Sequence, residues 1–233
     1  MKRLYILLLS AASLWGAVAH TNGNKATSAV PGTAIAAPSF TPVAGRQYIF
    51  SSECYDTTGT PASVGFAATG WSFTSVHALA GNANTGFIAT VRAYAPNNTA
   101  VVVTATWSQS CTFRGIFYDE FSGGDPTNFI DQAPVVATGT TGSCTQSVTP
   151  GVANSMLWSF CADSVTAVGA GFTAGQNDGS GDWTEYKLLS GGSGVAQTVN
   201  FTGTTGYWVQ ATISIKPDAG AVTSVRKRVM VTR

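Results

Sequence analysis

Two stretches of this chain share one pattern of apolar positions. Residues 46–54 read RQYIFSSEC and residues 154–161 read NSMLWSFC, so both are apolar runs that end in cysteine. Each follows a Ser-x-Thr-Pro sequence, at residues 39–42 and 147–150. The offset is 108 residues at the proline and 107 at the cysteine. A nearly constant offset between separate matches predicts a duplicated unit.

Further matches in the same order extend the duplication. GWSFT at residues 70–74 corresponds to GFT at 171–173, and FRGIFYDEFS at 113–122 to YWVQATISIK at 207–216. We therefore expect pseudo-repeats at about 33–122 and 140–217, together forming one β-sandwich domain over residues 20–217.

The polar and apolar alternation predicts strands throughout. Residues 85–94, TGFIATVRAY, and 100–107, AVVVTATW, flank an APNN turn and predict a β-hairpin. Similar runs recur between glycine-rich turns, and beyond the N-terminal segment no useful window has the apolar spacing of a helix. The pattern predicts an all-β protein of about ten to twelve antiparallel strands in two packed sheets, with almost no helix.

The composition agrees with this fold and suggests its compartment. Hydrophobic residues make up 44% of the chain, ample for a core, whereas charged residues make up only 10%, against about 25% in a typical globular domain. The 26 glycines suit tight turns between strands. Few charges with many small residues favour an extracellular surface.

The first 19 residues predict a secretory signal peptide. Lys2 and Arg3 precede an apolar run at residues 4–9, and the small residues 17–19, AVA, form a cleavage site that places the mature start near His20. The apolar run is shorter than the ~20 residues of a membrane span. No second hydrophobic span follows, so we expect a secreted protein without a transmembrane segment.

Cysteine number supports the same compartment. An exported chain with an even number of cysteines is expected to form disulfides rather than a metal site. Three pairings are open to Cys54, Cys111, Cys144 and Cys161. Because Cys54 and Cys161 hold equivalent places in the two repeats, they are candidates to lie near each other.

The charge distribution bears on partners. Two of the 12 basic residues lie in the leader and four in the last eight residues, which leaves six against 11 acidic residues. A body with a net charge of about −5 argues against nucleic acid as a partner, since phosphate binding needs clustered Lys and Arg. Residues 218–233 read as a flexible basic tail; a solvated terminus is favoured over a handle for an acidic partner.

Catalytic candidates are weak. Asp119 and Glu120 are adjacent on one predicted strand and point to opposite faces, so they cannot form the acid pair of a glycoside hydrolase together. Glu120 and Glu185 remain the best single carboxylates. His77 has no nucleophile motif such as GxSxG and reads as a half-buried strand histidine.

A polar loop at residues 177–182, NDGSGD, offers a candidate Ca²⁺ site. Asp178, Ser180 and Asp182 supply alternating hard oxygen ligands. The twelfth position counted from Asp178 is Leu189 rather than glutamate, so the EF-hand pattern fails and an ordinary polar turn is favoured.

Aromatic residues beside this loop offer a candidate ligand platform. Trp183 and Tyr186 follow Asp178 and Asp182 closely, and an aromatic face beside carboxylates suits a sugar ring. Core packing remains the ordinary alternative for any single tryptophan.

Three segments carry a family resemblance: FRGIFYDEFSG, GFTAGQ and the closing strand GYWVQATISIKP. With them the chain, from about residue 33 to 217, resembles exported bacterial and phage-associated β-sandwiches of the concanavalin A-like lectin/glucanase type. The resemblance implies a jelly-roll sandwich and glycan binding or adhesion. It transfers no catalytic residues, because none match.

The leading hypothesis is thus a secreted, non-enzymatic surface module that binds carbohydrate or a cell surface. The alternative is a structural virion, fibre or self-assembling surface protein. A glycoside hydrolase is the third choice.

Overall fold

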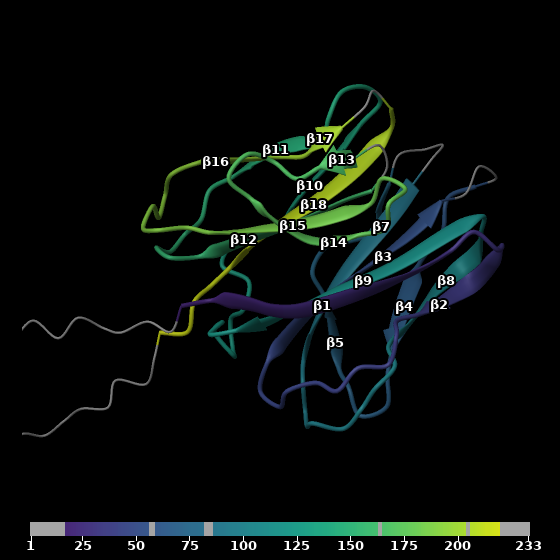
Figure 1. The fold of residues 1–233 in the computed structure, drawn as a ribbon, viewed down its shortest axis with the longest axis horizontal. Coiled ribbons are helices and arrows are strands. Elements are labelled where there is room, and N and C mark those ends of the chain that lie inside the picture. The colour runs from purple at the N-terminus through teal and green to yellow at the C-terminus, as the bar shows by residue number, and fades with distance from the viewer. Residues whose placement is uncertain (1–16, 56–58, 82–85, 163–164, 204–205, 220–233) are drawn as a thin grey trace, which may run out of the picture.

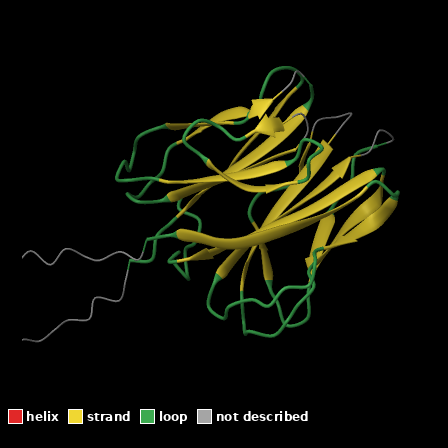
Figure 2. Ribbon diagram, viewed as in Figure 1, coloured by secondary structure: helices red, strands yellow, loops and turns green. Residues whose placement is uncertain are grey.

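The computed structural model describes residues 17–55, 59–81, 86–162, 165–203 and 206–219. Within these ranges the chain forms strands and loops and no helix (Figure 2). The predicted all-β class is confirmed. No helix in this part of the chain is long and apolar enough to cross a membrane.

The strands fall into two series. The first series comprises β1 (Ala19–Ser28), β2 (Gly32–Ala36), β3 (Gln47–Tyr55), β4 (Val64–Ala67), β5 (Phe73–Ser75), β6 (Ala80–Gly81), β7 (Gly86–Tyr94), β8 (Thr104–Cys111) and β9 (Phe113–Ser122). The second comprises β10 (Val135–Gly139), β11 (Thr145–Val148), β12 (Met156–Ala162), β13 (Val165–Ala167), β14 (Thr173–Asn177), β15 (Trp183–Leu188), β16 (Gln197–Asn200), β17 (Thr202–Gly203) and β18 (Trp208–Ile215).

Both series are wound in the same order. In the first, one sheet has the order β1-β9-β3-β7-β5, with β6 also paired to β7, and a smaller sheet has the order β2-β8-β4. In the second, the sheet β10-β18-β12-β15-β14 is accompanied by the pairs β11-β16 and β13-β17. Since one residue separates β16 from β17, together they occupy the place of β8. Each half is thus a jelly roll of a large and a small antiparallel sheet.

The repeated sequence motifs occupy equivalent strands. The two cysteine-ending runs form β3 and β12, each central in its large sheet, and the later matched segments form β9 and β18. Gly70 and Gly171 precede β5 and β14 with φ of 77° and 79°, a left-handed conformation that glycine adopts without strain. The halves begin at β1 and β10, before the starts expected from the sequence match. The match missed these first strands because they share no motif.

The two halves lie one above the other, with their large sheets face to face (Figure 1). Successive side chains point to opposite sides of a strand. On β12 and β18 one set therefore faces the first half, and the other set faces the small sheets of the second half. The shared core between the large sheets, called the seam here, includes Ile49, Ile88, Phe117, Phe121, Trp158, Phe160, Ala211, Ile213 and Ile215.

Asp119 is a buried carboxylate of the seam that connects the two halves. Its Oδ2 accepts a hydrogen bond from Trp158 Nε1 at 2.7 Å, and its Oδ1 lies 2.7 Å from His20 Nε2. The ring of His20 in turn stacks on Tyr186, with centroids 4.3 Å apart. Asp119 therefore joins β9 and β1 of the first half to β12 of the second. Val18, within the predicted cleavage site, is also buried in this core.

The disulfides join Cys54 to Cys111 and Cys144 to Cys161. Each lies within its own half and ties a central strand to the region of the small sheets. Cys54 and Cys161 are not bonded to each other: both point outward from the seam, so equivalence in the repeat places them on opposite outer sides.

The predicted hairpin at residues 85–107 is wrong. β7 belongs to the large sheet and β8 to the small one, so the two strands do not pair. The chain between them crosses the edge of the sandwich, where Val101 and Val103 are buried in the outer core. Alternation in sequence identified the strands, but it carries no information on their partners.

Removal of the two disulfides is expected to have unequal effects. The cysteines are separated by 57 residues in Cys54–Cys111 and by 17 in Cys144–Cys161. Because loop-closure entropy grows with length, C54A/C111A should lower the free energy of unfolding by about 4 kcal/mol and C144A/C161A by about 3 kcal/mol. Urea denaturation followed by tryptophan fluorescence measures both. A larger loss of unfolding free energy in C144A/C161A than in C54A/C111A would contradict this expected order.

Candidate functional site

The best candidate site is a hollow of about 310 Å³ at one end of the seam. Glu53, Tyr55 and Phe113 line it from the first half, and Ser180 and Asp182 from the second. Because side chains alternate along a strand, Glu53 and Tyr55 lie on the same inward face of β3 as Ile49. Phe113 lies opposite Tyr55 at the start of β9. We call this site the seam hollow.

The β14–β15 turn supplies the second half's part of the seam hollow. Asp178 Oδ1 accepts hydrogen bonds from the backbone N–H groups of Ser180, Gly181 and Asp182 at 2.7, 3.0 and 3.0 Å. Asp178 Oδ2 is buried without a hydrogen-bond partner. Asp178 thus shapes the turn that carries Ser180 and Asp182 to the hollow.

The predicted Ca²⁺ ligands are therefore in different situations. Asp178 has one oxygen committed to its own turn, whereas Ser180 and Asp182 line the hollow with Glu53. Within the described ranges no group of three or more His, Cys, Asp or Glu side chains is arranged to hold a metal ion. The Ca²⁺ site stays a prediction.

The two predicted aromatic ligands lie on opposite faces of β15. Trp183 packs outward against the core around the Cys144–Cys161 disulfide. Tyr186 faces the seam and stacks on His20. Of the four residues predicted to bind ligand, only Asp182 lines the seam hollow, so the structure does not bring Trp183, Tyr186 and the carboxylates together.

Sequence reasoning missed Glu53, Tyr55 and Phe113. One signal was present: Glu53 is a charged residue inside QYIFSSECY, a run buried at every position but the last. Burial of a carboxylate in such a run costs free energy, which sets this residue apart from its neighbours. Its meeting with Asp182 depends on the packing of the two halves, which no local pattern encodes.

Glu120 is a structural carboxylate within the first half. Thr21 Oγ1 donates a 2.7 Å hydrogen bond to its Oε1, Arg46 forms an ion pair with the same oxygen, and the Tyr48 hydroxyl donates to Oε2. Burial raises the pKa of Glu120, but the hydrogen bonds from Tyr48, Thr21 and Arg46 outweigh it and leave the pKa below the ordinary value. The group is therefore an ionised acceptor and is poorly suited to act as a general acid.

Glu185 is buried inside the second half. Its Oε2 accepts a 2.7 Å hydrogen bond from the backbone N–H of Gly169, while Oε1 has no hydrogen-bond partner. Burial raises the pKa of Glu185 to about 7, an effect that the hydrogen bond from Gly169 only partly opposes. Across β12 and β18 its neighbours are Ser159 and Thr212, which bond to each other at 2.7 Å.

Glu120 and Glu185 point away from each other. Glu120 lies on the outer side of the first large sheet, and Glu185 lies on the outer side of the second. Packed sheets are ~10 Å apart, and each of these side chains points outward from its own sheet, away from the other. Their carboxylates are therefore further apart than the ~5–9.5 Å between the acids of a glycosidase. These two residues do not form a catalytic pair.

His77 connects a turn to the neighbouring strand. It is half-buried in the turn after β5, where Nδ1 lies 2.6 Å from the carbonyl oxygen of Ala78 and Nε2 lies 2.9 Å from Thr90 Oγ1. Burial lowers its pKa. The ring connects this turn to β7.

Comparison with known proteins identifies no relative: no family model, no curated protein and no solved structure matches the chain.

The titration of Glu185 predicts an unusual pH dependence of stability. Its pKa is about 7 in the folded chain and near 4.5 when exposed, so the folded state binds more protons between these values. Stability should therefore fall as pH rises from about 4.5 to above 7, by up to about 3 kcal/mol at ~1.4 kcal/mol per pKa unit. Urea midpoints between pH 4 and 9 measure this slope.

Two variants isolate the contribution of Glu185. Glu185→Gln should flatten the slope and be more stable than the wild type at pH 8. Glu120→Gln is the matched control. The pKa of Glu120 is lowered, so its stabilisation is lost as pH falls below about 4.5; its removal should lower stability at higher pH by a constant amount and leave the slope between about pH 5 and 9 unchanged. An unchanged slope in Glu185→Gln would refute the assignment.

Proposed function

We propose that the protein is a secreted, non-enzymatic binding module and that it recognises carbohydrate in the seam hollow. The observation that carries this proposal is the lining of the hollow: two carboxylates, a hydroxyl and two aromatic rings, contributed by both halves. Two disulfides suit an extracellular location, as does the predicted signal peptide.

The lining matches the chemistry of a sugar. Hydroxyl groups of the sugar would donate hydrogen bonds to Glu53 and Asp182, and Ser180 would both donate and accept. The rings of Tyr55 and Phe113 offer apolar surface to the C–H groups of the sugar ring. A hollow of about 310 Å³ lies at the lower end of the range for small-molecule sites, which favours a single sugar unit over a long chain.

The two acids that the sequence offered for catalysis, Glu120 and Glu185, lie outside the hollow, which argues against hydrolysis by that pair. Glu120 is ionised and fully engaged, and Glu185 is enclosed in a separate core. The resemblance to lectin-type sandwiches supports the same choice and carries no catalytic residue.

A glycan array probed with the full chain, expressed with its own leader and run with and without Ca²⁺, tests this function. We expect specific binding that Tyr55→Ala and Asp182→Asn each weaken by about tenfold, equivalent to ~1.4 kcal/mol. Tyr207→Ala is the control, because Tyr207 is an exposed aromatic that does not line the hollow. A dependence on Ca²⁺ would add the Asp178 turn to the site.

Two further results would redirect the proposal. If Trp183→Phe abolishes binding and Tyr55→Ala does not, the ligand lies at the Trp183 platform and the seam hollow is not the site. If the folded protein binds no glycan and forms a stable oligomer by light scattering, the alternative of a self-assembling surface protein replaces the binding module.

A further inference from the structure

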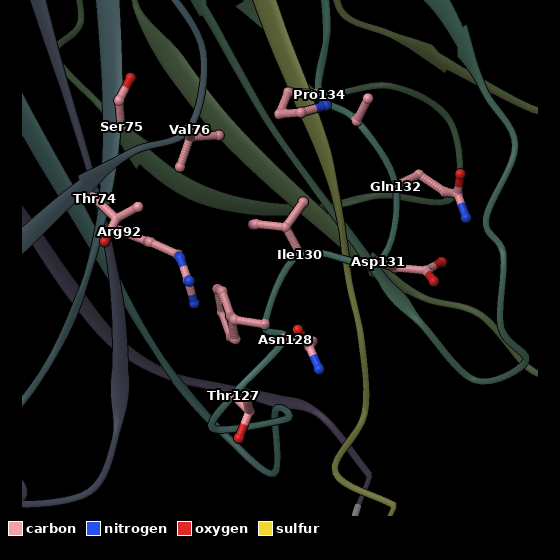
Figure 3. A pocket seen from close by; sticks show the side chains of 12 residues that line it. Thr74, Ser75, Val76, Arg92, Thr127, Asn128, Ile130, Asp131, Gln132 and Pro134 are labelled. Carbon is pink, nitrogen blue, oxygen red and sulfur yellow. The ribbon is translucent and has the colours of Figure 1, made fainter.

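A second hollow, of about 370 Å³, opens at the other end of the seam. Thr74, Ser75 and Arg92 line it from β5 and β7, and the β9–β10 connection closes the opposite side (Figure 3). Ile130 and Pro134 give that side an apolar surface above the buried Phe129, with the side chains of Thr127 and Asn128 beside it. The lining thus mixes apolar surface with hydroxyl and amide groups.

Arg92 is the cationic group of this hollow. It lies opposite Ile49 on the inward face of β7, is half-buried, and extends toward Asn128 (Figure 3). Its guanidinium makes no hydrogen bond or ion pair with any residue that the structure describes. By contrast, Arg46 pairs with Glu120. In a body with a net charge of about −5, an arginine that faces a hollow without a counter-ion is a specific feature.

The nearby carboxylate of Asp131 does not serve as that counter-ion. Its Oδ2 accepts hydrogen bonds from the backbone N–H groups of Gly151 and Val152, at 2.6 and 3.2 Å, and from the Ser214 hydroxyl at 3.2 Å. It lies across the hollow from Arg92 and points away from it (Figure 3). The chain has therefore committed this acid to the turn before β12 and left Arg92 open to an external anion.

We propose that this hollow binds a carboxylate carried on a polyhydroxylated small molecule, such as a sugar acid. The planar guanidinium of Arg92 pairs with the carboxylate through two parallel hydrogen bonds. Hydroxyl groups of the ligand bond to Thr74, Thr127 and Asn128, and the ring packs on Ile130 and Pro134.

The site is separate from the seam hollow and opposite to it in charge. Arg92 lies beside Ile49, whereas Glu53 lies four residues further along β3, or about 13 Å at ~3.3 Å per residue. The seam thus has a cationic opening at one end and an acidic opening at the other. The proposal does not depend on the seam hollow, because no lining residue is shared.

Isothermal titration of the full chain with D-glucuronate and with D-glucose tests the site. We expect measurable binding of glucuronate and at least tenfold weaker binding of glucose, since a charge-assisted pair supplies most of the affinity. Arg92→Gln should weaken glucuronate binding at least tenfold, and Arg92→Lys should restore only part of it, because lysine lacks the planar fork. Added salt should weaken binding further.

Two control variants test whether binding depends on overall charge or on the seam hollow instead of on Arg92. Lys25→Gln removes one positive charge on β1, three strands or about 14 Å from β7, and should leave binding unchanged. Asp182→Asn, in the seam hollow, should also leave it unchanged.

The proposal is overturned if glucuronate does not bind, if glucose binds equally well, or if Arg92→Gln binds like the wild type.

If glucuronate does bind, a trigalacturonate probe distinguishes the two sources of such a ligand. Tighter binding than the monomer indicates an acidic polysaccharide, and equal binding indicates a free sugar acid.

Discussion

The structure depends on the burial of two sheet faces against each other. The inward faces of β12 and β18 carry Trp158, Phe160, Ala211, Ile213 and Ile215, and these pack in one core with Ile49, Ile88, Phe117 and Phe121 of the first half. Exposing such a surface to water would cost about 25 cal/mol for each Å² of apolar area. Each jelly roll therefore buries one face of its large sheet against the other half. Asp119 fixes how the halves align, because its two oxygens bond to residues of different halves.

The two halves have diverged inside while their strand order has been kept. The outer core of the first half is aromatic, with Phe40, Tyr48, Phe50 and Tyr118 in contact. The corresponding core of the second half contains a hydrogen-bonded polar group of Gln146, Ser159, Gln210 and Thr212. The buried acids follow this division: Glu120 is fully bonded and ionised, whereas Glu185 lacks a partner for one oxygen and has its pKa raised. The two hollows described above lie at the open ends of the seam, outside both of these cores.

The sequence predicted what short-range pattern controls. Alternation identified the strands, and the repeated cysteine-ending runs correctly identified β3 and β12 as equivalent. It failed where the outcome depends on which faces meet. β7 and β8 look like a hairpin but belong to different sheets, and the equivalent Cys54 and Cys161 point apart. For the same reason the sequence predicted only part of the lining of the seam hollow. Ser180 and Asp182 lie in a recognisable polar loop, whereas Glu53 and Phe113 reach the hollow only because distant strands pack together.

The pairing of β1 with β9 also affects when the protein can fold. His20 and Asp119 are 99 residues apart, and the ladder between these strands joins the start of the first half to its end. A strand whose partner is so distant stays unpaired until nearly the whole half has been made, and such non-local pairing slows folding. A chain with this connectivity cannot complete its first half before β9 is made. Once made, β9 closes the first half and presents the surface on which the second half packs.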